Sequence, residues 1–265
     1  MFIGSANREK LRDDMAGHSK WANIKHRKAA QDAKRGKIFT RLIREITISA
    51  RLGGGNPDDN PRLRAAIDKA LDGNMTKDTI ERAVKRGAGS DESENLEELV
   101  YEGYAPNGVA VLVEAMTDNR NRTVAEVRHA FSKHGGNLGT DGSVAYLFEK
   151  RGAFYFEPEQ TTEDQLMDVA LDVGADDIVS NDDGSFEVFC PPSDYHQVRE
   201  ALKSAGFAWA SDEITMQPSM KVDLDITSAE KVLKLLDRLE ELDDVQNVHS
   251  NADFSDEVME ALEAQ

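Results

Sequence analysis

Residues 37–61 read KIFTRLIREITISARLGGGNPDDNP, and this stretch sets the character of the first third of the chain. Its apolar residues recur every fourth position, which places them on one face of a helix: Ile38, Leu42, Ile46 and Ala50. Gly53-Gly54-Gly55 ends that helix. Asn60 is a good helix cap and Pro61 suits the first position of the next helix. The stretch therefore predicts two helices joined by a glycine-rich turn.

The helical pattern continues on both sides of this stretch, from Ser19 to about Gly89. An apolar stripe follows Pro61, and Thr76 begins a third helix that Gly87 is expected to stop. We assign residues 15–90 to a three-helix domain. Residues 1–14 show no clear periodicity, and we treat them as an extension that is not part of the fold.

Strand patterns replace the helices after the acidic link at residues 91–95. Residues 99–103 and 108–116 read as strands around the turn at Ala105-Pro106-Asn107-Gly108. The apolar run 109–113 favours a buried central strand. A helix is expected over 123–134. Further strands are expected over 144–148 and 153–157, separated by Lys150-Arg151-Gly152.

A second set of elements follows, made of helices over 162–173 and 193–205, a hairpin over 178–190, an extended stretch over 214–224, a helix over 228–242 and a strand over 245–248. The order predicts an α+β fold: a three-helix domain, then two split βαβ, ferredoxin-like domains with one inserted in the other. We expect one domain over 91–149 plus 216–252, and the inserted one over 150–215. Residues 253–265 are expected to form an acidic, helical or frayed tail.

Charge is distributed unevenly along the 265 residues, whose formal net charge is −18. Residues 15–51 contain ten Lys and Arg against two acidic residues, whereas residues 91–265 carry a formal −27. One end of the chain thus attracts phosphate and the other repels it. Two independently solvated faces would explain the same counts, but the steep contrast favours a polyanion partner.

The single cysteine, Cys190, fits a reducing compartment and cannot form an internal disulfide. A small core residue before Pro191 is a better interpretation of it than a catalytic thiol. No stretch has the length of apolar residues that a membrane helix needs, and the N-terminus lacks the apolar core of a signal peptide. We therefore expect a cytoplasmic protein without a membrane partner.

We found no catalytic or metal-binding motif in the sequence. The glycine-rich run 136–142 follows a helix, whereas a phosphate-cradling loop precedes one. The six histidines show no ligand spacing, and Asp182, Asp183 and Glu187 are explained by a hairpin turn. The interpretation is a non-enzymatic protein with no cofactor, no metal and no small-molecule substrate.

The basic segment from Gly17 to Lys37 and the helix after it carry the candidate binding residues. Cations there interleave with an indole, an imidazole and amides, a pattern suited to phosphate contacts. The candidates for nucleic-acid contact are Lys20, Lys25, Arg27, Lys28, Lys34, Arg35, Lys37, Arg41 and Arg44. Trp21 and His26 are candidates for stacking on a base, although Trp21 could equally anchor the segment on the helical core. A solvated helix face is the alternative for the whole run.

Several strings resemble the YebC/PmpR family. They are MAGHSKWANIKHRK from Met15, KIFTRLIREI from Lys37, YEGYAPNG from Tyr101, DNRNRT from Asp118 and HGGNLG from His134. The resemblance spans about residues 15–250. It implies a helical domain followed by two α+β domains, and a role as a transcriptional regulator that binds DNA. It also implies a link to translation, through a mitochondrial translational activator and through bacterial relatives connected with ribosomes stalled on proline-rich chains.

Two nucleic-acid hypotheses remain from the sequence. In the first, the basic segment and helical domain bind DNA, with phosphate contacts dominating the affinity. In the second, the same surface binds ribosomal RNA, and the −27 balance of residues 91–265 favours this, because free duplex would repel those residues. An enzyme acting on a small molecule is the third class, and the sequence offers no convergent polar pocket for it.

Overall fold

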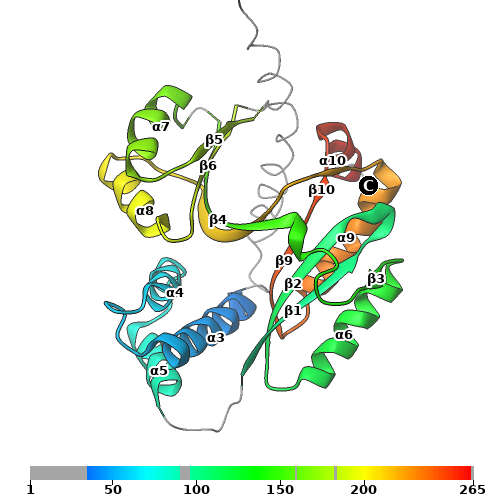
Figure 1. The fold of residues 1–265 in the computed structure, drawn as a ribbon, viewed down its shortest axis with the longest axis horizontal. Coiled ribbons are helices and arrows are strands. Elements are labelled where there is room, and N and C mark those ends of the chain that lie inside the picture. The colour runs from blue at the N-terminus through cyan, green and yellow to red at the C-terminus, as the bar shows by residue number, and fades with distance from the viewer. Residues whose placement is uncertain (1–34, 90–95, 159, 182–183, 264–265) are drawn as a thin grey trace, which may run out of the picture.

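The first elements of the part of the chain that the structure describes are three helices (Figure 1): α3 (Arg35–Gly53), α4 (Pro61–Asp72) and α5 (Lys77–Ala88). The computed structural model describes residues 35–89, 96–158, 160–181 and 184–263. Asn60 and Thr76 cap α4 and α5 as predicted, because their side chains accept from the amides of Leu63 and Thr79. Ile46, Leu63 and Ile80 meet in one apolar interior.

Gly87 lies inside α5 and does not stop it, contrary to the sequence prediction. A Cβ on Gly87 would lie 2.1 Å from the carbonyl oxygen of Thr47 on α3. The close approach of α3 and α5 therefore requires glycine at this position.

The first sheet has the strand order β3-β1-β2-β9, built from β1 (Glu97–Tyr104), β2 (Ala110–Thr117), β3 (Asn137–Leu138) and β9 (Val245–Ser250). Helices α6 (Arg120–Lys133) and α9 (Ile226–Glu240) cover one face, where Val111 and Val113 join the core that contains Phe131 and Leu235. Ala110 and Leu112 point to the other face, against Val144 and Phe148. Because both faces are covered, the buried central strand predicted over 109–113 is confirmed.

The second sheet has the order β5-β6-β4-β7, from β4 (Phe148–Phe156), β5 (Asp177–Ser180), β6 (Phe186–Cys190) and β7 (Ser211–Pro218). Helices α7 (Glu163–Ala170) and α8 (Tyr195–Ser204) pack on it. The elements of this second domain follow the order βαββαβ along the chain, from β4 to β7. The first sheet differs, because it begins with the hairpin β1–β2. The α+β fold class is confirmed. Cys190 is fully buried in this core, and burial raises the pKa of its thiol to about 12.

Three local predictions were wrong. Residues 144–147 form no strand but a 3₁₀ turn, η3 (Ala145–Leu147), and one long strand then crosses Lys150-Arg151-Gly152 without interruption. Helix α6 begins three residues before Thr123, because the side chain of Asn119 accepts from the amide of Arg122 and caps it. Helix α8 begins at Tyr195, after the cap residue Asp194, and not at residue 193 as predicted.

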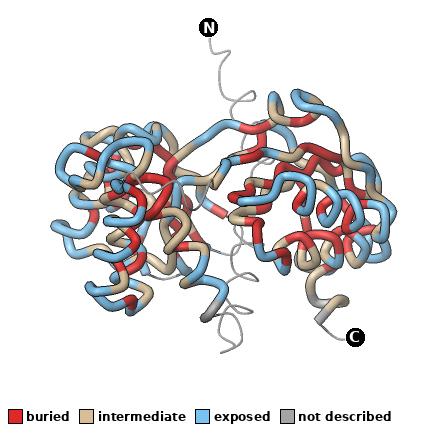
Figure 2. Tube along the Cα trace, turned by 90° about the horizontal axis from the view of Figure 1, so that it is seen from below, coloured by how far each residue is buried: buried red, intermediate tan, exposed pale blue. Residues whose placement is uncertain are grey.

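The C-terminal stretch packs on the first sheet's helical layer. Strands β8 (Val222–Asp223) and β10 (Ala252–Asp253) pair in parallel, and α10 (Asp256–Glu263) lies beside α9. Phe254 and Val258 are buried there. Figure 2 shows buried residues gathered into separate interiors on the left and right of the view. No helix among the described residues is both long and apolar enough to cross a membrane.

Candidate nucleic-acid interface

Helix α3 carries its apolar and basic residues on opposite sides. Leu42, Ile46 and Ala50 face the core of the helical region. Lys37, Arg41 and Arg44 recur at i, i+4 and i+7, which places them on the other side. The helical region can therefore present three cations from one helix face to a negatively charged partner.

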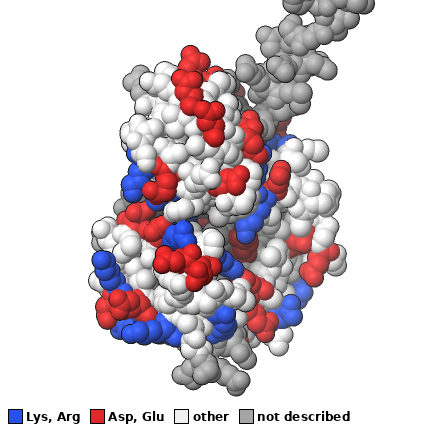
Figure 3. Space-filling view, turned by 60° about the vertical axis from the view of Figure 1, so that its left-hand side comes forward, with Lys and Arg blue, Asp and Glu red and all other residues white. Residues whose placement is uncertain are grey.

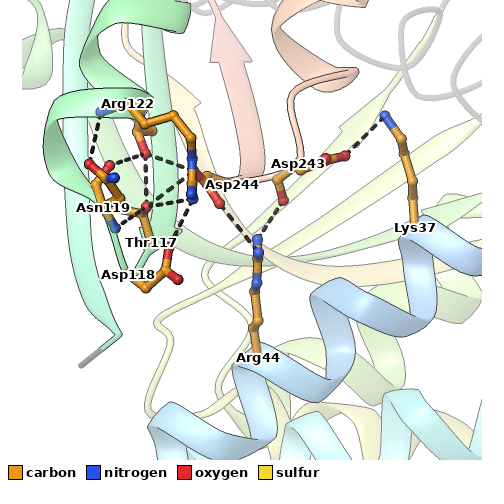
Figure 4. Close-up of polar contacts among 9 residues, drawn as sticks. Lys37, Arg44, Thr117, Asp118, Asn119, Arg122, Asp243 and Asp244 are labelled. Atoms are coloured by element: carbon orange, nitrogen blue, oxygen red, sulfur yellow. Dashed lines mark hydrogen bonds and ion pairs between the residues drawn. The ribbon is translucent and has the colours of Figure 1, made fainter. Parts of the chain in front are cut away.

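In the structure that partner is the C-terminal end of α9 and the turn that follows it. Lys37 Nζ donates to the carbonyl oxygen of Glu241, Arg41 Nη2 to that of Glu240 and Arg44 Nη1 to that of Asp243. Figure 4 shows Lys37 and Arg44 extending from α3 toward Asp243 and Asp244. The last carbonyls of a helix have no partner within it and carry partial negative charge, so cations stabilise them. Burial lowers the pKa of Arg41, assisted by Arg44 and opposed by Glu240.

Asp244 lies where α3, β2, α6 and the start of β9 meet. Its side chain is 2% exposed and accepts from the hydroxyls of Thr117 and Thr123 and from the guanidinium of Arg122. Arg44 Nη2 lies 3.3 Å from its second oxygen. Burial alone would raise the pKa of Asp244, but the hydrogen bonds from Arg122, Thr123 and Thr117 outweigh it and hold the pKa below its usual value.

Two further arginines tie the helical region to the sheets. Arg62 on α4 binds both Glu45 on α3 and Glu98 on β1. Arg199 on α8 bridges Asp72 at the end of α4 and Asp212 on β7, at 2.9 and 2.8 Å. Figure 3 shows the resulting pattern on that side of the molecule, with Lys and Arg interleaved among Asp and Glu over its lower part.

The structure places the candidate residues of the sequence in two groups. Lys37, Arg41 and Arg44 come together as one basic face, and in this conformation that face is turned toward α9. Arg35 is the first residue of α3. The other candidates lie outside the described residues: Lys20, Trp21, Lys25, His26, Arg27, Lys28 and Lys34.

Sequence reasoning missed the acidic side of this contact. Asp243, Asp244 and Arg122 are far from α3 in the chain, and nothing in their local pattern predicts the pairing. One signal was present: Arg122 belongs to the DNRNRT string from Asp118, which carried part of the family resemblance. The end of α9 also reads Glu-Glu-Leu-Asp-Asp over 240–244, an acidic cluster at an already negative helix end.

The glycine-rich run 136–142 leads into a loop that binds an internal anion. The carboxylate of Glu102 accepts from the amides of Gly142, Val144 and Ala145 at 2.6–2.7 Å. Burial would raise the pKa of Glu102, but these three backbone hydrogen bonds lower it. These amides are thus already occupied by a carboxylate of the chain itself, and they also explain why the backbone at Val144 does not join a strand.

Two family descriptions match the chain. "TACO1/YebC protein N-terminal domain" matches residues 19–90, and "TACO1/YebC second and third domain" matches residues 96–252. The chain belongs to the YebC/PmpR family. The "Transcriptional regulatory protein PmpR" of Pseudomonas aeruginosa is 66% identical over 248 residues, which cover 94% of this chain and 100% of that protein.

Other relatives agree with this assignment. A "Probable transcriptional regulatory protein" of Shewanella oneidensis is 65% identical over the same coverage. The crystal structure of a conserved hypothetical protein from Aquifex aeolicus superposes with a TM-score of 0.76 at 49% identity, covering 85% of this chain and 93% of that one. The family membership and its α+β fold inferred from the sequence are confirmed.

Proposed function

We propose that this YebC/PmpR-family chain is a non-catalytic, cytoplasmic regulator of gene expression that binds DNA through its basic N-terminal segment and helical region. The observation that carries the proposal is the charge of residues 15–51, ten Lys and Arg against two acids, in a chain whose net charge is −18. The relatives named as transcriptional regulatory proteins support the same role.

The contacts of α3 support this choice of surface. Its three cations donate to backbone carbonyl oxygens at the end of α9, and Arg44 also pairs with the carboxylate of Asp244, so this face already binds oxygen acceptors, which phosphate also offers. Because Lys37, Arg41 and Arg44 are engaged in this conformation, the initial phosphate contacts are assigned to Lys20, Lys25, Arg27, Lys28, Lys34 and Arg35. A nucleic acid that also used α3 would have to compete with the end of α9.

The second candidate function is a ribosome-bound translation factor. The observation that favours it is the formal −27 of residues 91–265, which free duplex DNA would repel but basic ribosomal proteins would attract. The basic segment would then bind ribosomal RNA.

Binding to duplex DNA and to ribosomes across a salt series tests both candidates. The segment variant Lys25→Glu/Arg27→Glu/Lys28→Glu is compared with Lys203→Glu, an exposed position on α8 outside the proposed interface, and Lys25→Glu alone matches that control in charge. Removal of one phosphate contact should lower the log–log salt slope by about 0.9. Selective loss of DNA binding in the segment variant supports the proposal. Tight ribosome binding with weak, unselective DNA binding supports the second candidate, and equal loss in both variants contradicts a segment-specific interface.

A further inference from the structure

Helix α6 is a basic element in an acidic part of the chain. It carries Arg120, Arg122, Arg128 and Lys133 against a single acid, Glu126, although residues 91–265 hold a formal −27. Arg120, Arg128 and Lys133 are exposed, and none of the three has a side-chain hydrogen bond or ion pair with another described residue. Their charges therefore face solvent.

Helix α9 adds cations beside α6. The two helices pack next to each other on the same face of the first sheet (Figure 1). On α9, Lys231, Lys234 and Arg238 recur at i, i+3 and i+7 and so lie along one side of the helix. Lys234 pairs with Glu230 and Arg238 with Glu241, but both pairs are exposed, and such pairs are weak and screened by salt.

The cations of α6 and α9 lie close to one another at the C-terminal end of α6. The pKa of His134, the residue that follows α6, is lowered by burial and then by the charges of Lys133, Arg238 and Lys234. Positive charges from both helices therefore lie near the His134 side chain. We call Arg128, Lys133, Lys234 and Arg238 the α6–α9 strip.

The outward face of α6 has the chemistry of a phosphate-binding surface. Between its cations lie the small or polar residues Asn121, Ala125, His129 and Ser132 and the one acid of the helix, Glu126, all exposed. Amide and hydroxyl groups donate to phosphate oxygens, whereas a protein interface is enriched in aromatic residues and a membrane-surface helix presents large apolar ones. This face presents neither.

We propose that the outward face of α6 and α9 binds the phosphodiester backbone of a nucleic-acid duplex as a second contact surface. This proposal rests on the proposed function and adds a site to it. Helix α6 is 14 residues and about 20 Å long, which equals the rise of about six base pairs along the axis of a DNA duplex. It starts at the junction that holds α3, since Arg122 and Arg44 share Asp244, so the two basic helices approach one point.

The test uses the full chain and duplexes of about 20 bp, one of DNA and one of RNA, titrated by fluorescence anisotropy over a salt series. The strip variant is Arg128→Glu/Lys133→Glu. The single variant Lys133→Glu is also measured, and Lys203→Glu is its matched control. Both lysines are exposed and lie in the last turn of their helices. The segment variant Lys25→Glu/Arg27→Glu/Lys28→Glu runs in parallel, and urea unfolding verifies that each variant is folded.

For at least one duplex the strip variant should bind about tenfold more weakly, with a salt slope lower by about 1.8 because two phosphate contacts are removed. Lys203→Glu should bind like wild type. If the strip variant binds both duplexes like Lys203→Glu while the segment variant loses binding, the strip proposal falls and the proposed function stands. If only the strip variant loses binding, the result supports binding by the α6–α9 strip and contradicts the proposed N-terminal interface. If neither variant changes, both fall.

Discussion

Two basic helices of this molecule use their charge in different ways. On α3, Lys37, Arg41 and Arg44 are turned toward the end of α9 and bind its carbonyls and Asp244. On α6, Arg128 and Lys133 face solvent without an ion pair among the described residues. The first set stabilises the arrangement of the helical region on the sheets, and the second is available for a partner. Basic residues counted along a sequence therefore do not measure the charge that a partner meets.

Asp244→Asn should lower the free energy of unfolding more than any other substitution considered, because it removes the carboxylate that holds the basic face of α3. Asparagine keeps one oxygen that can accept from Thr117, Thr123 and Arg122, but its NH2 group then faces Arg44, and the buried negative charge that Arg44 and Arg122 share is lost. We expect the free energy of unfolding in urea to fall by about 3 kcal/mol. The neighbouring Asp243→Asn is the control, because that carboxylate is 86% exposed and should change stability by less than about 0.5 kcal/mol.

Arginine-to-alanine substitutions on the two helices sharpen the comparison directly. Arg44→Ala removes the hydrogen bond to the carbonyl oxygen of Asp243 and the ion pair with Asp244, so it should lower the free energy of unfolding by about 1–2 kcal/mol. Arg128→Ala touches no described partner and should change it by less than about 0.5 kcal/mol. Equal losses of stability in the two variants would contradict the distinction between engaged and free cations.

Limited proteolysis of the same pair provides a second readout. Arg44→Ala should increase cleavage between α5 and β1, because the helical region loses part of its attachment to α9, while Arg128→Ala should be cleaved like wild type. Arg62 still links α4 to β1 in both variants, so the increase is expected to be partial.

A change of pH should alter the free energy of unfolding less than the substitutions above. The reason is that burial and hydrogen bonding move the pKa of Asp244 in opposite directions. Its pKa is lower in the folded than in the unfolded chain. Its contribution is therefore complete above the unfolded value of about 3.9 and is lost as the pH falls through the folded value. The difference in free energy of unfolding between wild type and Asp244→Asn should stay constant from about pH 7 to about pH 5 and narrow as the pH falls below about 4. A difference that stays constant or widens on acidification would show that Asp244 is not held ionised by these contacts.

Local sequence signals determined most of the secondary structure. Asn60 and Thr76 fixed the starts of α4 and α5, and the run 109–113 identified the central strand, because caps and apolar periodicity act within a few residues. The prediction failed at residues 144–147. There the backbone amides of Val144 and Ala145 bind Glu102, more than 40 positions away, and no local pattern records such a partner.

The sequence by itself also determined the family and the polarised charge of the chain, since both are properties of residue order alone. Only the tertiary structure decided which cations are engaged. Lys37, Arg41 and Arg44 look like surface charges from their helical spacing, and they are held because the fold brings the end of α9, some 200 positions later, against α3. A hydrogen bond or ion pair acts over a few ångströms in space, whatever the distance along the chain, so the pairing of charges follows from the fold and not from their order.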